Sequence, residues 1–288
     1  MAARGVDVLL LGREGNARYV SGARRLFLAS ERAFAPGCVV VRETGAVHLL
    51  SLTDFGVPPE LPRSQLYAPS WNPATVVGRV AAIPGVAEAK HVGVDGLTPL
   101  FEALLAGALP AAEFVDGEAL MRTVRRIKST DEVALLRAAA DVADATLRVA
   151  LDAVANGAAE ATVKAVAMEA MAAQGVTTAA FEPRIQRDGE RVSVAVGVLR
   201  AGWEADIART APGAARPDAL IDAIARCRPG TPVARLDADV HGVGLGYEVV
   251  RPSDVLEAGM VVSIGTAGGR DTVLVTPTGP DVLTGPPV

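Results

Sequence analysis

The chain has 288 residues, half of them apolar, so it can form one large domain or two ordinary ones with a sizeable core. Its net charge is −5, and its basic residues are interspersed rather than gathered in a stripe, which argues against a nucleic-acid partner. Cys38 and Cys227 are too few for a disulfide framework or a thiolate metal cage. The first apolar run, 6–11, is too short for a signal core or a membrane span. We expect a soluble, cytoplasmic protein with no membrane partner.

The N-terminal part alternates strand and helix patterns. Helices are predicted over 75–83 and 97–105, the first of them stopped by Pro84. The segment 13–22 is turn-rich, and 58–73 is a proline-rich connection. Short apolar runs bounded by turn residues predict strands at 6–11, 38–41, 47–52, 91–95 and 113–115. This alternation predicts a small α/β domain over residues 1–125.

The C-terminal part follows a junction at 118–127 and starts with two helices. Ser129 is a predicted N-cap, and Glu132 stands where it completes a capping box. The helix continues with one apolar stripe to Asn156-Gly157, and a second helix is predicted over 160–173. Further elements are a short helix at 218–227 and strands at 192–199, 205–210, 261–264 and 272–275.

Five stretches of the chain share the order of a known set of motifs: 127–133, at the entry to the first long helix, then Ala205–Thr210, His241–Gly244, Glu257–Ile264 and Asp271–Thr276. They resemble motifs of the pita-bread family of prolidases, aminopeptidases P, methionine aminopeptidases and creatinases. The resemblance implies an α/β fold with a creatinase-like N-terminal domain, 1–125, and a shortened pita-bread domain, 126–288. It also implies a homodimer. The segment 211–240 is about twenty residues shorter than the resemblance suggests, which indicates a truncated connection between elements.

The resemblance further implies that most metal ligands have been lost. Enzymes of this family hold two divalent ions with two aspartates, one histidine and two glutamates, ligands suited to Mn²⁺, Co²⁺ or Zn²⁺. Asp206 and His241 match retained ligands, whereas Ala195 and Gly265 stand at an aspartate and a glutamate position. The last glutamate either was removed by a two-residue deletion or is replaced by Arg270.

Three functional hypotheses follow from this pattern. The first is a prolidase-like protein that no longer works as a two-metal peptidase, has no cofactor, and keeps a pocket for a small molecule or peptide. The second is a metal-independent, creatinase-like enzyme with His241, Glu248 and Arg270 as candidate catalytic residues; Glu248 stands where the family has a further histidine. The third is a hydrolase with one Mn, Co or Zn ion on Asp206 and His241, completed by Glu204 or Glu248.

Two aromatic residues are candidate substrate-binding groups. Trp203 and Tyr247 could line a pocket near the site, and a place in the hydrophobic core is the alternative for both. The glycines at 242, 244 and 246 do not form a phosphate loop, because no helix start follows them and no lysine is present.

Overall fold

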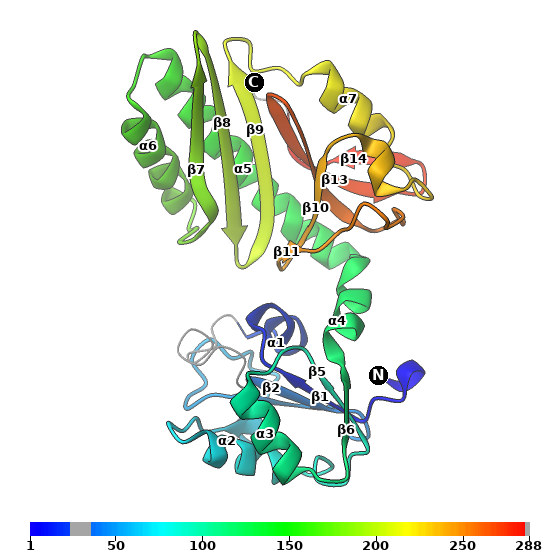
Figure 1. The fold of residues 1–288 in the computed structure, drawn as a ribbon. Helices are drawn as coiled ribbons and strands as arrows, with labels where there is room; N and C mark the ends of the chain where they lie inside the picture. The colour runs from blue at the N-terminus through cyan, green and yellow to red at the C-terminus, as the bar shows by residue number, and fades with distance from the viewer. Residues whose placement is uncertain (24–35, 286–288) are drawn as a thin grey trace. The chain divides into compact units, whose positions relative to one another are not determined.

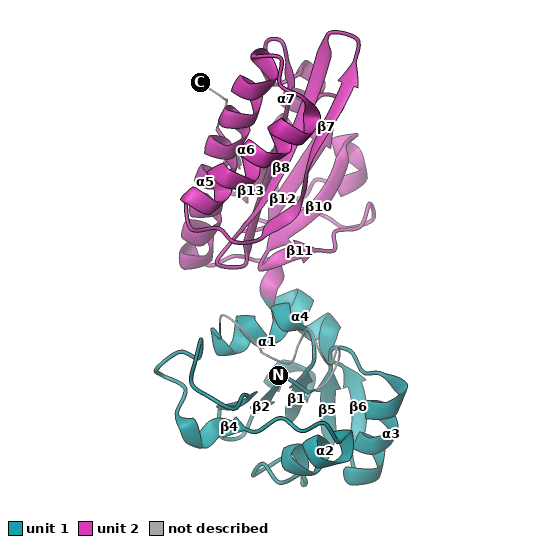
Figure 2. Cartoon of the chain, turned by 90° about the vertical axis from the view of Figure 1, so that its left-hand side faces the viewer, with its two compact units in different colours: residues 1–124 teal, residues 125–288 magenta. Residues whose placement is uncertain are grey.

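The computed structural model describes residues 1–23 and 36–285. The chain divides into two compact units, residues 1–124 and 125–288 (Figure 2). Within the described residues, no helix is both long enough and apolar enough to cross a membrane.

The first unit is built on a six-stranded mixed sheet in the order β4-β3-β2-β1-β5-β6. The central strand β1 pairs antiparallel with β2 and parallel with β5. The strands are β1 (Val8–Leu11), β2 (Cys38–Val41), β3 (Ala46–Leu50), β4 (Leu66–Tyr67), β5 (His91–Val94) and β6 (Glu113–Asp116).

Helices cover both faces of this sheet, as expected for a strand that is apolar at every position. Val8 and Leu10 of β1 pack in one core with α2 and α3, while Leu9 and Leu11 pack in the other with α1 and α4. Asn72 and Thr98 cap α2 and α3 by accepting backbone hydrogen bonds. The helical segments are η1 (Ala2–Arg4), α1 (Glu14–Ser21), η2 (Arg63–Gln65), α2 (Pro73–Ala81), α3 (Pro99–Ala108) and α4 (Gly117–Arg126).

One prediction for this part of the chain was wrong: the turn-rich segment 13–22 contains helix α1. The predicted junction, 118–127, for which no secondary structure was predicted, is largely helix α4. Helix α1 has no side-chain cap of its own. Asp95, which directly follows β5, supplies the missing acceptor: it accepts hydrogen bonds from Gly12 N at 2.7 Å, Arg13 N at 3.1 Å and Asn16 Nδ2 at 2.9 Å. A cap contributed from distant sequence leaves no local pattern.

Replacing Asp95 by alanine is expected to lower the free energy of unfolding by about 2–3 kcal/mol, because partly buried donors lose their acceptor. Asp116→Ala is a matched control, since Asp116 caps the exposed start of α4 through Ala119 N alone, at 2.8 Å. Its expected cost is about 1 kcal/mol. Urea denaturation measures both, and equal losses would contradict the role given to Asp95.

The second unit contains a strongly curved antiparallel sheet in the order β11-β10-β12-β13-β9-β8-β7, with β14 paired to β13 (Figure 1). Strands β7, β8 and β9 form two long hairpins. The strands are β7 (Ala179–Asp188), β8 (Arg191–Arg200), β9 (Trp203–Ala211), β10 (Asp239–Gly244), β11 (Gly246–Glu248), β12 (Val261–Thr266), β13 (Gly269–Thr276) and β14 (Gly279–Val282).

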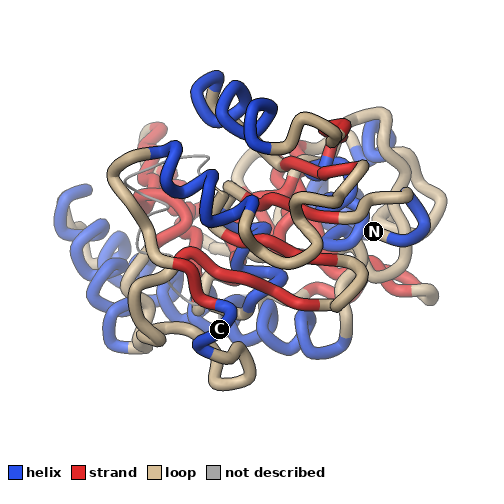
Figure 3. Tube along the Cα trace, turned by 90° about the horizontal axis from the view of Figure 1, so that it is seen from below, coloured by secondary structure: helices blue, strands red, loops and turns tan. Residues whose placement is uncertain are grey.

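Helices pack on one face of this sheet (Figure 1). Figure 3 marks the helices, strands and loops along the trace. Helix α5 begins with the predicted capping box, in which Ser129 and Glu132 exchange hydrogen bonds. Leu220 and Ile224 of α7 share a core with Val262, Ile264 and Val273. Because side chains alternate along a strand, the intervening residues belong to the face without helices. The helices are α5 (Thr130–Ala155), α6 (Glu160–Ala173), α7 (Asp218–Ala225) and the short η3 (Val233–Leu236).

Candidate functional site

Asp206 and His241 meet because the sheet curls over its helix-free face. Their strands, β9 and β10, are separated by β12 and β13 in the sheet order. In a flat sheet, that separation would be about 14 Å at the usual strand spacing. His241 Nε2 nevertheless lies 3.7 Å from Asp206 Oδ2. Asp206 is buried, with 1% exposed surface, so the curled sheet holds its carboxylate away from water.

The guanidinium of Arg270 occupies the centre of this group. Its Nε lies 3.7 Å from Asp206 Oδ2, and its Nη2 donates to Asp239 Oδ2. Its Nη1 donates to Ser263 Oγ at 2.7 Å and lies 3.4 Å from His241 Nδ1. The side chain is only 17% exposed. One cation from β13 therefore contacts side chains from β9, β10 and β12.

Gly265 gives the guanidinium its space. Gly265 and Arg270 are register partners in the β12–β13 hairpin, so any side chain at 265 would point to the same face as Arg270. A Cβ added to Gly265 would lie 2.3 Å from Arg270 Nη2. The Arg270 side chain therefore occupies the space that a side chain at position 265 would need. Both sequence interpretations of the lost glutamate place Arg270 near it, and the register puts Arg270 on the site face.

His241 is set up as a neutral ring. Burial lowers its pKa and the Arg270 charge lowers it further, while Asp206 opposes both effects. Arg270 Nη1 is a donor, so Nδ1 of His241 accepts and Nε2 carries the hydrogen, facing Asp206. Tyr247 stacks on the imidazole with ring centroids 5.1 Å apart and is itself 63% exposed. The structure therefore brings His241, Arg270 and Tyr247 together.

Glu204 is a second buried carboxyl on this strand. It precedes Asp206 by two residues, so the two share a face. It is 5% exposed, and no hydrogen bond or ion pair to it is found among the described residues. Burial, then Asp206, then Glu248 raise the pKa of Glu204 to about 7.

Glu248 is paired elsewhere. Its register partner is Gly242, the neighbour of His241, so Glu248 and His241 point to opposite faces of the β10–β11 ribbon. Its Oε2 accepts from Lys128 Nζ at 2.7 Å, and its Oε1 lies 3.2 Å from Arg125 Nη2. Burial lowers the pKa of Lys128, an effect that Glu248 counteracts. Glu248 is therefore an ion-pair partner of two cations.

Trp203 and Ala195 lie apart from the central contacts. Alternation along β9 places Trp203 on the face opposite Asp206, where it is 9% exposed. Ala195 lies on the face of Asp206, diagonal to it, in β8. Asp206 pairs directly with Gly197, whose bare Cα is covered by the Phe181 ring: an added Cβ would lie 2.3 Å from Phe181 Cε1.

Sequence analysis missed two of the closest partners in the site. Asp239 was not considered, although it precedes His241 by two residues and therefore shares its face on a strand. Ser263 was not among the predicted site residues; its observed partner is the Arg270 guanidinium. No local sequence pattern indicates that contact, because Ser263 and Arg270 meet across a hairpin whose register is set by its turn.

The residues present do not fit a pair of divalent ions. Within residues 1–23 and 36–285, no group of three or more histidine, cysteine or acidic side chains could hold a metal ion. Ala195 and Gly265 offer no donor atoms. Arg270 places a positive charge 3.7 Å from the Asp206 carboxylate, where a cation would otherwise bind.

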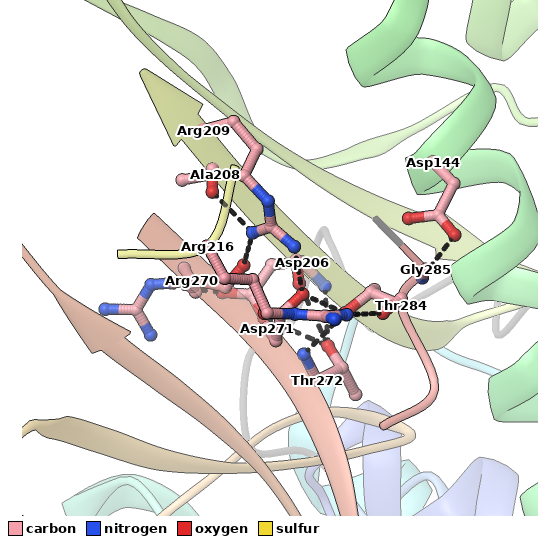
Figure 4. Close-up of polar contacts among 10 residues, drawn as sticks. All are labelled: Asp144, Asp206, Ala208, Arg209, Arg216, Arg270, Asp271, Thr272, Thr284 and Gly285. Carbon is pink, nitrogen blue, oxygen red and sulfur yellow. Dashed lines mark hydrogen bonds and ion pairs between the residues drawn. The ribbon is translucent and has the colours of Figure 1, made fainter. Parts of the chain in front are cut away.

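A second polar cluster lies on the opposite face of β13 (Figure 4). Asp271 Oδ1 accepts from Arg209 Nη2 at 2.7 Å and from Thr284 Oγ1 at 2.8 Å, and Oδ2 accepts from Arg216 Nε at 2.7 Å. Asp271 and Arg209 are both 0% exposed. Figure 4 shows the Arg270 side chain leaving β13 on the other side. This cluster ties β9, β13 and the C-terminal segment together and has a structural role.

Asp144 of α5 adds a pH-sensitive carboxyl beside this cluster. Its Oδ2 accepts from Gly285 N at 2.6 Å, whereas its Oδ1 is buried and has no partner in the described part of the chain. Burial raises the pKa of Asp144 to about 6. The folded state then binds more protons than the unfolded state between about pH 4 and pH 6, so stability falls as the pH rises through that window.

Asp144→Asn is expected to raise the free energy of unfolding above pH 6 by an amount on the order of 2 kcal/mol, because the amide keeps an acceptor for Gly285 without the charge. The gain should largely disappear near pH 4, because the side chain at position 144 is then uncharged in both folded proteins. Thermal denaturation of the two proteins at pH 4 and pH 7.5 measures the difference. A gain of the same size at both pH values would show that charge is not its cause.

Comparison with known proteins places this arrangement in context. Residues 1–127 match the family model of the creatinase/prolidase N-terminal domain. No curated protein matches the chain. The prolidase from Pyrococcus horikoshii OT3 superposes with a TM-score of 0.76 at 21% identity, covering 99% of this chain and 95% of that one. The prolidase from Pyrococcus furiosus gives 0.76 at 20%, with 99% and 96% covered. The Xaa-Pro dipeptidase from Bacillus anthracis gives 0.72 at 18%, with 98% and 94% covered.

These likenesses confirm the predicted fold class. The chain has a creatinase-like N-terminal domain followed by a shortened pita-bread domain. Identities near 20% establish a common fold, and the chemistry must be argued from the side chains of this chain.

Proposed function

Starting from a creatinase/prolidase N-terminal domain and the pita-bread fold, we propose that this protein binds a small molecule or peptide and is not a two-metal peptidase. A single observation carries the proposal: the Arg270 guanidinium lies among Asp206, Asp239, His241 and Ser263. In a dinuclear site, anionic ligands offset the charge of the ions. Here Ala195 and Gly265 offer no side-chain donor atom at two of the expected ligand positions. Arg270 places a fixed positive charge near the third.

A concavity beside Arg270 supports the binding part of the proposal. It has a volume of ≈ 690 Å³ and opens widely to solvent. Asp237, Asp239, Thr266 and Arg270 contribute to its lining, together with Gly265 and small alanines. Thr266 Oγ1 is buried and has no hydrogen-bond partner in the described part of the chain, so a ligand carrying a hydrogen-bonding group could satisfy it.

Two assays test the proposal on the purified protein. Hydrolysis of Xaa-Pro dipeptides in added Mn²⁺ is expected to stay at background. A thermal-shift screen with dipeptides and small amino compounds is expected to identify a stabilising ligand. Asp239→Ala should abolish that shift, whereas Asp188→Asn, an exposed change on β7, should leave it intact. Turnover of Xaa-Pro substrates with two metal ions bound would refute the proposal.

A further inference from the structure

We infer that the Arg270 guanidinium is the resident cation of this site: it replaces an external ion as the charge that holds Asp206, Asp239 and His241 together. The inference rests on the proposed function and adds a specific role for one residue. It predicts that the site is already filled by the protein's own side chain.

The charge balance around Asp206 supports this role for Arg270. Asp206 is 1% exposed and has no other cationic partner within 4 Å in the described chain besides Arg270 and the pH-dependent His241. A buried carboxylate without a counter-charge is strongly unfavourable. Of these two partners, only the guanidinium keeps its charge at every ordinary pH, so Arg270 is the charge that offsets Asp206.

The directions of the contacts made by the Arg270 guanidinium also support this role. Each nitrogen of the guanidinium faces a different polar group: Nε faces Asp206, Nη1 faces Ser263 and His241, and Nη2 faces Asp239. A planar fork with fixed donor directions can satisfy groups from several strands at once, which a lysine ammonium on its flexible stem does less well. The site is therefore shaped for a guanidinium.

The space beside Gly265 supports the same role. The bare Cα of Gly265 leaves room that Arg270 fills, and no larger residue fits there while Arg270 keeps its position. The guanidinium is also supported by strands on either side of β13 in the curled sheet. An external cation would have to displace the Arg270 side chain, which already donates to Asp239.

The test uses Arg270→Ala with an external guanidinium as the probe. The variant is expected to melt at least about 5 °C below the wild type, because Asp206 loses its counter-charge. Methylguanidinium at about 10 mM should then raise the melting temperature of this variant and not that of the wild type, by filling the vacated space. Arg137→Ala is the matched control: Arg137 pairs with Asp281, and both side chains are more than a third exposed. It should melt near the wild type and show no response.

Arg270→Met provides a second variant if Arg270→Ala fails to fold, because methionine keeps the apolar stem and removes only the charged head. It should lower the melting temperature more than Arg137→Ala does. The inference is overturned if neither Arg270 variant is less stable than the Arg137 control, or if methylguanidinium shifts wild type and Arg270→Ala alike. Those results leave the proposed function untouched, since that proposal is tested separately, by the metal content and the Xaa-Pro cleavage of the wild type.

Discussion

Asp271→Asn is expected to lower the free energy of unfolding by about 3–5 kcal/mol, because it leaves Arg209 charged, buried and without its counter-ion. Both side chains are 0% exposed, and Asp271 accepts hydrogen bonds from Arg209, Arg216 and Thr284. Within the described residues, no other carboxylate lies within 4 Å of the Arg209 guanidinium, whose Nη1 donates to the carbonyl oxygens of Ala208 and Arg270. Urea denaturation followed by circular dichroism measures the loss.

A double variant separates the ion pair from its surroundings. Arg209→Met combined with Asp271→Leu removes both charges and keeps apolar volume, so it should be less destabilised than Asp271→Asn alone. If the double variant is instead less stable than the single one by several kcal/mol, the hydrogen bonds to Arg216 and Thr284, rather than the Arg209 pair, hold the cluster.

The second large effect is expected from introducing carboxylates at the positions where the family resemblance implies metal ligands. Ala195→Asp, Gly265→Glu and Arg270→Glu together should bind Mn²⁺ at least about 100-fold more tightly than the wild type, equal to about 2.7 kcal/mol. All three positions lie on the face of Asp206, and removing Arg270 frees the space that a Gly265 side chain needs. Titration calorimetry with Mn²⁺ measures the affinity.

The matched control for this restoration is Ala195→Asp alone, which adds a carboxylate but leaves the guanidinium in place. It should gain little affinity. If the triple variant folds like the wild type and still binds no Mn²⁺, then side chains at these three positions do not decide whether this site binds metal.

The sequence predicted the elements whose signals are local. The capping box at Ser129 and Glu132 marked the start of α5 correctly, and apolar runs marked β1, β5 and β12. Strand β7 was missed because its outer half is polar and exposed and it contains Pro183. Strand β10 was read only as a family motif, since Gly242 and Gly244 have low strand propensity and the strand depends on its partners.

The candidate site was predictable in part. Resemblance to the family pointed to Asp206, His241 and Arg270, which the structure brings together. The resemblance also pointed to Glu248. Glu248 pairs with the neighbour of His241, so its side chain lies on the opposite face of the strands, where it contacts Lys128 and Arg125. Neither the sequence spacing nor the composition indicated that Arg270 would point into the site. The register of the β12–β13 hairpin decides that orientation, and a shift of one residue would reverse it.

The metal content of the wild-type chain tests the central claim most directly. The protein would be incubated with excess Mn²⁺, freed of unbound ions by gel filtration and measured by mass spectrometry of its elements. We predict far less than one metal ion per chain, because Arg270 holds the position and the other ligands are absent. Two tightly held ions per chain would contradict the account.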